Sequence, residues 1–149
     1  MSLEHIHLTV NAKISPSFKA LPREDAQRFV DRLLKAIEMK PLGPLNWADA
    51  VDLDFPGQSF VQMITTSHCS MHLFTHKDGS NEFYFDLYSC RCFDVNTVLE
   101  LLNDQFGIKE WHGTLYTRAS DERPVVKIIG SHLKEKRGEK MLTMAPTCR

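Results

Sequence analysis

The sequence predicts an α+β fold: a two-layer sandwich in which two helices lie on one face of a mainly antiparallel sheet. The segments follow the order strand, helix, several strands, helix, strand, so most strands are consecutive and can pair through short turns. Only two segments have the apolar spacing of a helix face. At 149 residues the chain is long enough to bury one core.

The first third of the chain predicts a strand followed by a helix. Residues 5–11 alternate between polar and apolar side chains, which is typical of a half-buried strand. Residues 24–40 place apolar side chains on one helical face, and Pro41 with Gly43 ends that pattern. Residues 41–58 are predicted to form a loop, with room for a short strand over residues 51–54.

The middle of the chain predicts three consecutive strands. Residues 59–66 and 68–75 are rich in β-branched, aromatic and methionine side chains. The turn signal Lys77-Asp78-Gly79-Ser80 comes next, and the side chains of residues 81–89 then alternate between two sets, with Phe83, Phe85 and Leu87 opposite Tyr84, Asp86 and Tyr88.

The last elements are a helix and a strand. Asp94 is suited to the N-cap of the second helix and Gly107 to its C-cap, and residues 111–117 supply the last strand. We therefore predict one domain over residues 1–122 and a basic, mobile tail over residues 123–149.

Composition excludes several classes of function. The net charge is −1, so nothing in the overall charge indicates nucleic-acid binding. No apolar run is long enough to cross a membrane, and the N-terminus lacks the basic-then-apolar pattern of a signal peptide. We expect a cytoplasmic protein that acts on a small molecule. The polar side of the strands carries histidines, hydroxyls and tyrosines, where a plain solvent face would carry lysine and glutamate, so we also expect a homodimer.

Reactive side chains gather between Ser59 and Cys92, and three kinds of chemistry compete for them. The first is a metal site, because His68, His72 and His76 recur every four residues. On a strand, however, the Cα atoms of His68 and His72 would lie about 13 Å apart, too far for one zinc ion. A metal would need ligands from neighbouring strands, and we expect none.

The second is ordinary hydrolysis with Ser67 or Cys90 as the nucleophile, but no glycine-flanked elbow surrounds Ser67. The third is self-cleavage. A serine at the start of a strand can attack the carbonyl before it and turn the amide into an ester. β-Elimination and hydrolysis then leave a pyruvoyl group and ammonia. Residue spacing does not decide among the three.

Two blocks of sequence carry a resemblance to a known family. They are Ser67-His68-Cys69-Ser70-Met71-His72 and Phe85-Asp86-Leu87-Tyr88-Ser89-Cys90. Together they resemble the core of the bacterial S-adenosylmethionine decarboxylases, which carry Ser-His-x-x-x-His on one strand and Asp-x-aromatic-Thr-Cys at the end of the next. Ser59 and the opening run from His7 to Asn11 are also similar, so the resemblance covers residues 5–117.

The resemblance implies a role for each matching residue. Ser67 would become the pyruvoyl cofactor by cleavage of the Thr66–Ser67 bond, and this group would form a Schiff base with S-adenosylmethionine. His72 is implied in the cleavage with help from Ser59, and Cys90 is implied as the acid that reprotonates the α-carbon. The implied pathway is polyamine (spermidine) synthesis. Five positions separate Ser67 from His72, which would put them on opposite faces of a regular strand, so we predict an irregular backbone at residues 66–68.

The sequence also departs from the family pattern. Thr66 stands where the family usually has glutamate, and an aromatic-Pro-Glu run that helps hold the substrate is absent after His72. Asp78 or Glu82 would have to replace that acid, and Phe55 and Phe74 could stack on an adenine. Two alternatives stay open: a pyruvoyl decarboxylase of arginine or ornithine, and an unprocessed, non-catalytic homologue that serves as a binding or regulatory subunit.

Overall fold

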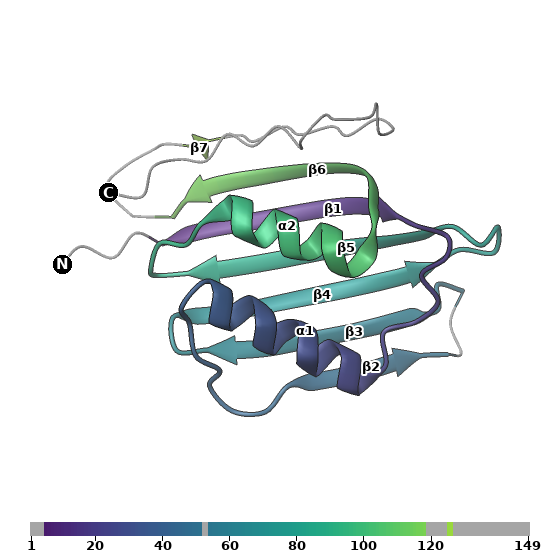
Figure 1. The fold of residues 1–149 in the computed structure, drawn as a ribbon, viewed down its shortest axis with the longest axis horizontal. Coiled ribbons are helices and arrows are strands. Elements are labelled where there is room, and N and C mark those ends of the chain that lie inside the picture. The colour runs from purple at the N-terminus through teal and green to yellow at the C-terminus, as the bar shows by residue number, and fades with distance from the viewer. Residues whose placement is uncertain (1–4, 52–53, 119–124, 127–149) are drawn as a thin grey trace.

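The computed structural model describes residues 5–51, 54–118 and 125–126. Its sheet has seven strands in the order β2-β3-β4-β5-β1-β6-β7, and every neighbouring pair is antiparallel (Figure 1). The strands are β1 (Ile6–Ile14), β2 (Asn46–Ala50), β3 (Gly57–Ile64), β4 (Ser67–Thr75), β5 (Asn81–Ser89), β6 (Ile108–Thr117) and β7 (Val125–Val126), and the helices are α1 (Arg23–Ala36) and α2 (Val95–Phe106).

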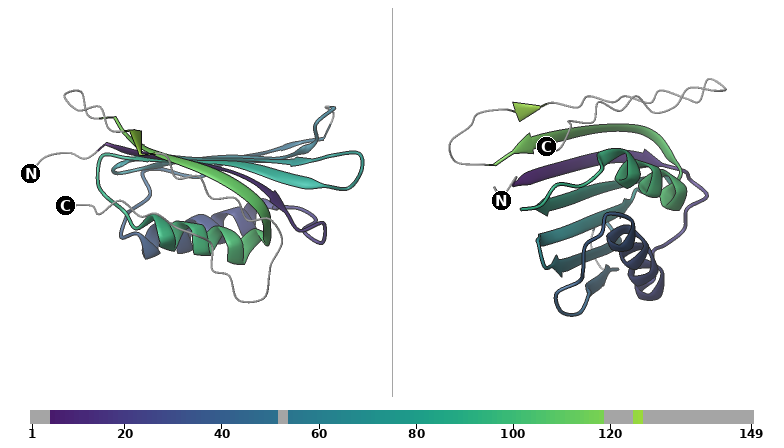
Figure 2. Two further views of the ribbon diagram at one scale, coloured as in Figure 1. Left: turned by 90° about the horizontal axis from the view of Figure 1, so that it is seen from above. Right: turned by 60° about the vertical axis from the view of Figure 1, so that its left-hand side comes forward.

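Both helices pack on the same face of the sheet, and no element of the described residues covers the other face (Figure 2). The core lies between the two layers, where the apolar side of each helix meets every second side chain of the strands. Phe29 of α1, Phe106 of α2 and Phe83 of β5 are among the largest buried side chains there. The predicted two-layer α+β sandwich is therefore confirmed.

Helix α2 has both of its predicted caps, whereas α1 ends earlier than the sequence indicated. The Asp94 carboxylate accepts hydrogen bonds from the N–H groups of Asn96 and Thr97 at 2.8 and 3.2 Å, and Gly107 has a φ of 66°, so both predicted caps of α2 are confirmed. Helix α1 ends at Ala36, earlier than predicted. There the chain turns through Glu38, which has a φ of 57° although it is not a glycine.

The edge strand β2 differs from the sequence-based expectation. It covers Asn46–Ala50, within the predicted loop over residues 41–58 and before the short strand allowed at residues 51–54, of which residues 52–53 lie outside the described part of the chain. Its composition of Asn, Ala and Asp hides the strand pattern. Tertiary contacts hold it in place: it pairs with β3, and the Trp47 indole N–H donates to the Leu21 carbonyl at 3.0 Å.

The C-terminal end of the sheet passes the predicted domain boundary at residue 122. Val125 and Val126 form β7 and pair with Tyr116 and Leu115 of β6. The remainder of the predicted tail over 123–149 lies outside the described residues. Within the described part of the chain, neither helix has the length and apolar character needed to span a membrane.

Candidate active site

The open face of the sheet is built by simple alternation along each strand. In β4, the side chains of Cys69, Met71 and Leu73 are buried under the helices. The intervening side chains, from His68 to Phe74, belong to the opposite face. We use "open face" below for this uncovered side of strands β3, β4, β5, β1 and β6.

The hairpin between β3 and β4 turns through only two residues, Thr65 and Thr66. Two-residue hairpins normally place positive φ angles inside the turn, where glycine or asparagine tolerates them. Here both turn residues are β-branched, and the positive φ falls on Ser67 instead, at 152°. A non-glycine residue in such a conformation costs about 1–3 kcal/mol. The irregular backbone predicted at residues 66–68 is confirmed.

The peptide between Thr66 and Ser67 is held from two sides. The Thr66 carbonyl accepts a hydrogen bond from the Cys90 backbone N–H at 2.9 Å, and the Thr66 hydroxyl donates to the Met39 sulfur at 3.2 Å. The N–H of Thr65 donates to the Lys40 carbonyl at 3.0 Å. These contacts fix the carbonyl carbon that a Ser67 hydroxyl would attack.

Cys90 comes close to Ser67 because β4 and β5 pair in register. Ser67 lies opposite Ser89, the residue before Cys90. The buried Ser89 hydroxyl accepts from the Arg91 N–H at 2.9 Å and donates to the Arg91 carbonyl at 2.6 Å, which forms a tight turn just after β5. Cys90 is a free, half-buried thiol in this turn.

Ser59 and His72 form a second pair, far from the first. They lie opposite each other in β3 and β4, and the Ser59 hydroxyl is 2.7 Å from His72 Nδ1. Five positions along β4 separate His72 from Ser67, which corresponds to about 16 Å between their Cα atoms. The four predicted catalytic residues thus fall into two pairs that one chain does not bring together.

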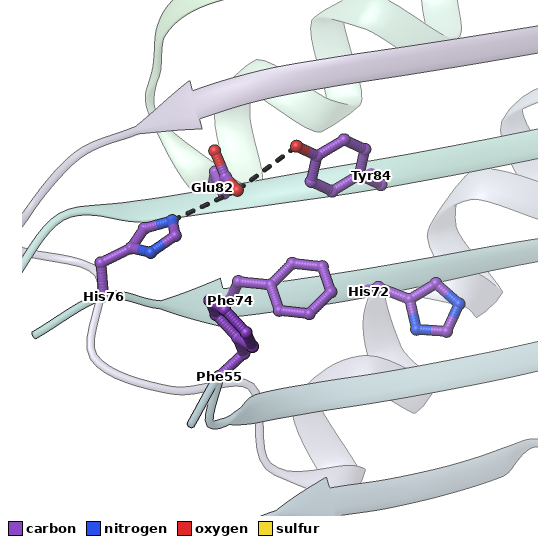
Figure 3. A pocket seen from close by; sticks show the side chains of 6 residues that line it. All are labelled: Phe55, His72, Phe74, His76, Glu82 and Tyr84. Carbon is purple, nitrogen blue, oxygen red and sulfur yellow. Dashed lines mark hydrogen bonds and ion pairs between the residues drawn. The ribbon is translucent and has the colours of Figure 1, made fainter. Parts of the chain in front are cut away.

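A hollow of about 410 Å³ opens on the open face beside His72 (Figure 3). All three predicted substrate-binding residues line it: Phe55, Phe74 and Glu82. The Phe74 ring lies between the His72 ring, stacked at 6.4 Å, and the Tyr84 ring, edge-on at 5.7 Å.

The loop that carries Phe55 can approach β4 closely because residue 57 is glycine. A Cβ atom at Gly57 would lie 1.8 Å from the Leu73 carbonyl oxygen, and the Thr75 N–H donates to the Pro56 carbonyl at 2.9 Å. Phe55 itself stays 61% exposed, at the rim of the hollow.

Glu82 provides the acid of this hollow. Its Oε1 atom accepts from the Tyr84 hydroxyl at 3.3 Å and lies 3.2 Å from His76 Nε2 (Figure 3). Burial, followed by the charge of Glu82, raises the pKa of Tyr84. Asp78, the other candidate acid, lies in an exposed turn, where hydrogen bonds from Ser80 lower its pKa. Two further residues line the hollow: Tyr84, which the sequence did not single out, and His76, which it suggested only as a metal ligand.

A polar network near the Ser67 end of the open face was also not predicted in detail. His7 Nε2 lies 2.5 Å from the Asp86 carboxylate, and the Tyr116 hydroxyl lies 2.6 Å from His7 Nδ1. His68 Nε2 is 3.9 Å from the same carboxylate. The strand pairing brings these residues together. From the sequence, alternation along each strand indicated only that their polar side chains share one face of the sheet. The described residues include no group of histidine, cysteine and acid side chains that could hold a metal ion.

Cys69 lies on the other side of β4, fully buried. Burial, with a smaller effect from the Asp86 charge, raises its pKa to about 12. Its thiol therefore stays protonated and unreactive at physiological pH.

Comparisons with known proteins agree with this geometry. The family described as S-adenosylmethionine decarboxylase matches residues 6–119. No curated protein matches the chain. Among solved structures, the adenosylmethionine decarboxylase from Aquifex aeolicus superposes with a TM-score of 0.59 at 15% sequence identity, covering 85% of this chain and 100% of that one. At this identity the likeness concerns the fold alone, whereas the family match spans most of the chain. The chain belongs to the S-adenosylmethionine decarboxylase family, a family of decarboxylating enzymes.

Proposed function

We propose that this chain is a proenzyme that cuts its own backbone between Thr66 and Ser67, forms a pyruvoyl group from Ser67, and decarboxylates S-adenosylmethionine for spermidine synthesis. One observation carries the proposal. Ser67 has a strained backbone, and the carbonyl before it is hydrogen-bonded by the Cys90 N–H at 2.9 Å.

The cleavage begins when the Ser67 hydroxyl oxygen attacks the Thr66 carbonyl carbon. A C–O bond forms, the C–N bond breaks, and the hydroxyl proton passes to the freed nitrogen. During the attack, negative charge develops on the Thr66 carbonyl oxygen, to which the Cys90 N–H already donates. Breaking the peptide bond also releases the constraint that holds Ser67 at a φ of 152°.

The resulting ester is then eliminated. A base removes the Ser67 α-proton, and the Thr66 carboxylate leaves from the β-carbon. The dehydroalanine that remains takes up water, loses ammonia and becomes the pyruvoyl group. Once formed, this group serves as an electron sink for the carbanion that loss of carbon dioxide produces. Cys90, whose backbone N–H donates to the Thr66 carbonyl, carries a half-buried thiol that is the proposed donor of the proton returned to the α-carbon.

The Ser59–His72 pair needs a second copy of the chain to take part. It lies about 16 Å along β4 from its own Ser67, but a copy packed against the open face could bring its own pair there. The open face suits such a partner, because Val61, Met63 and Tyr84 expose 41%, 56% and 42% of their surface on it. We therefore propose a homodimer with composite sites.

The hollow around Phe74 is the proposed substrate pocket. Aromatic rings can stack on a purine and attract a positively charged sulfur. The Glu82 carboxylate keeps acceptor capacity beyond its contacts with His76 and Tyr84, enough for the hydroxyl groups of a ribose.

Mass spectrometry of the purified protein tests the proposal. Cleavage predicts two pieces of about 7.5 and 9.5 kDa, and the larger piece should resist Edman degradation because its N-terminus is a ketone. Ser67→Ala should remain intact at 17.1 kDa less one oxygen atom. The cleaved protein should release carbon dioxide from S-adenosylmethionine and not from arginine or ornithine. A wild-type chain that stays intact through prolonged incubation would contradict self-cleavage and favour a non-catalytic homologue.

A further inference from the structure

An ion pair links the two segments that hold the Thr66–Ser67 peptide. Arg91, which directly follows Cys90, donates from Nη1 to the Glu38 carbonyl at 3.3 Å. Its Nη2 atom lies 3.8 Å from the Glu38 carboxylate oxygen Oε2. One guanidinium therefore contacts both the backbone and the side chain of Glu38.

The conformation of Glu38 is unusual for its residue type. It follows the end of α1 with a φ of 57°, in the position where helices commonly place glycine. The Met39 N–H donates to the Leu34 carbonyl at 2.8 Å, and the Glu38 N–H donates to the Lys35 carbonyl at 3.2 Å. These are the two bonds of a Schellman motif, in which glycine would be less strained than glutamate.

The contacts form a closed ring around the scissile peptide. The Thr66 hydroxyl reaches Met39, which is bonded to Glu38, and Glu38 holds Arg91. Arg91 is bonded to Cys90, whose N–H returns to the Thr66 carbonyl. Among these links, the Glu38–Arg91 pair is the one that joins the segment after α1 to the turn after β5.

We propose that Glu38 and Arg91 are a positioning pair for self-cleavage, which keeps the Cys90 N–H on the carbonyl that Ser67 attacks. This inference rests on the proposed function. Neither residue touches the reacting atoms; the pair acts through the segments that carry Cys90 and Met39. It also gives a reason for a glutamate at a position suited to glycine.

The pair should govern cleavage and not turnover. Once the bond is broken, Thr66 ends a separate piece, and its carbonyl no longer needs the Cys90 N–H. Decarboxylation then depends on the Cys90 thiol and the substrate pocket. Both side chains are largely exposed, at 57% for Arg91 and 83% for Glu38, so salt should screen their attraction.

The test follows cleavage from synthesis onward in a cell-free translation reaction, by gel and mass spectrometry. Arg91→Gln and Glu38→Gln should cleave about two- to fivefold more slowly than wild type, the effect of losing one solvent-exposed ion pair. Arg91→Lys should keep part of the rate. Arg28→Gln is the matched control, because Arg28 pairs with Asp25 on α1, far from the cleaved bond. After full cleavage, kcat per pyruvoyl group should be equal in all of them.

Glu38→Gly separates positioning from stability. Glycine suits the positive φ, so this variant should melt at a higher temperature than wild type and yet cleave more slowly. Raising the salt concentration to 1 M should slow wild-type cleavage and leave Arg91→Gln unchanged. Equal cleavage rates in wild type, Arg91→Gln and Glu38→Gly would overturn the inference, as would an equal loss of kcat per pyruvoyl group. If wild type itself does not cleave, the proposed function fails and the inference falls with it.

Discussion

The two ends of strand β4 differ in which groups form the candidate site: mainly backbone groups at one end and side chains at the other. At the Ser67 end, backbone groups predominate: a strained φ, and a carbonyl held by the Cys90 N–H. At the Phe74 end, side chains make a hollow of aromatic rings around a Glu82–His76 pair. Seven positions separate the two ends, or about 23 Å. One strand therefore carries a place suited to breaking a bond and a place suited to binding a ligand, and neither can serve the other within one chain.

The largest expected effect comes from separating the two ends onto different chains. Ser67→Ala and His72→Ala should each remain uncleaved when expressed alone. When the two are co-expressed, a mixed dimer would combine the Ser67 of one chain with the Ser59–His72 pair of the other. Half of the chains in such dimers should then be cleaved, which mass spectrometry would detect because only the His72→Ala chain can be cut. Co-expressed chains that stay entirely intact would contradict the composite site.

Cys69, on the buried face of β4, should make the stability of the folded protein depend on pH. Its pKa is about 12 in the folded protein against an ordinary value of 9.0. Folding therefore favours the protonated thiol, and this stabilisation is complete below pH 9 and is lost as the pH rises from 9 to 12. Over that range, the free energy of unfolding of wild type should fall by about 1.4 kcal/mol per pH unit more than that of Cys69→Ala. Urea denaturation at several pH values measures both, and parallel curves would contradict the burial of this thiol.

Glu82→Gln tests whether the Phe74 end binds substrate. The amide keeps the shape but loses the charge, so KM for S-adenosylmethionine should rise about tenfold, with cleavage of the proenzyme unchanged. Asp78→Asn is the control, because Asp78 lies in an exposed turn and does not line the hollow. Steady-state kinetics on fully cleaved protein would give both values. An equal KM in the two variants would contradict a role for Glu82 in binding the substrate.

The smallest effect concerns the strain at the Ser67 end. Glycine accepts the φ of 152° and alanine does not, so Ser67→Gly should be more stable than Ser67→Ala by about 1 kcal/mol. Neither variant can cleave, so the comparison is free of chemistry. At Ser70, in the regular part of β4, the order should reverse, because glycine weakens an ordinary strand. Chemical denaturation of the four variants would show whether the strain is local to residue 67.

Much of the fold could be predicted because it follows from periodicity and caps. The alternation in residues 81–89, the Asp94 cap and the Gly107 cap each depend on neighbours in sequence, and each is confirmed. Strand β2 could not be predicted, since its polar residues are held by pairing with β3. The irregular backbone at Ser67 was inferred from the family resemblance and the spacing together, because the resemblance implies joint action of two residues that lie five positions apart on a strand.

The sequence suggested candidate site residues but not how they are arranged. Ser59 and His72 were expected near Ser67 in space, yet register places them opposite each other and far along the strand. Tyr84 reaches Glu82 through a hydrogen bond and His76 through an ion pair, and no local sequence pattern predicts either contact. The choice of Glu82 over Asp78 likewise needed coordinates, since both acids lie within a few positions of the same turn.

The sheet order has a consequence for the product of the proposed cleavage. Residues 1–66 contain β1, β2 and β3, whereas residues 67–149 contain β4, β5, β6 and β7. Because β1 lies between β5 and β6 while β3 pairs with β4, the two pieces interdigitate within one sheet (Figure 1). The two pieces of a cleaved molecule therefore cannot separate unless the hydrogen bonds between paired strands are broken. The two polypeptides should co-elute under native conditions. After denaturation they must associate again by diffusion, so the yield of refolded cleaved protein should depend on protein concentration. Refolding of the uncleaved chain should not, because it involves a single chain.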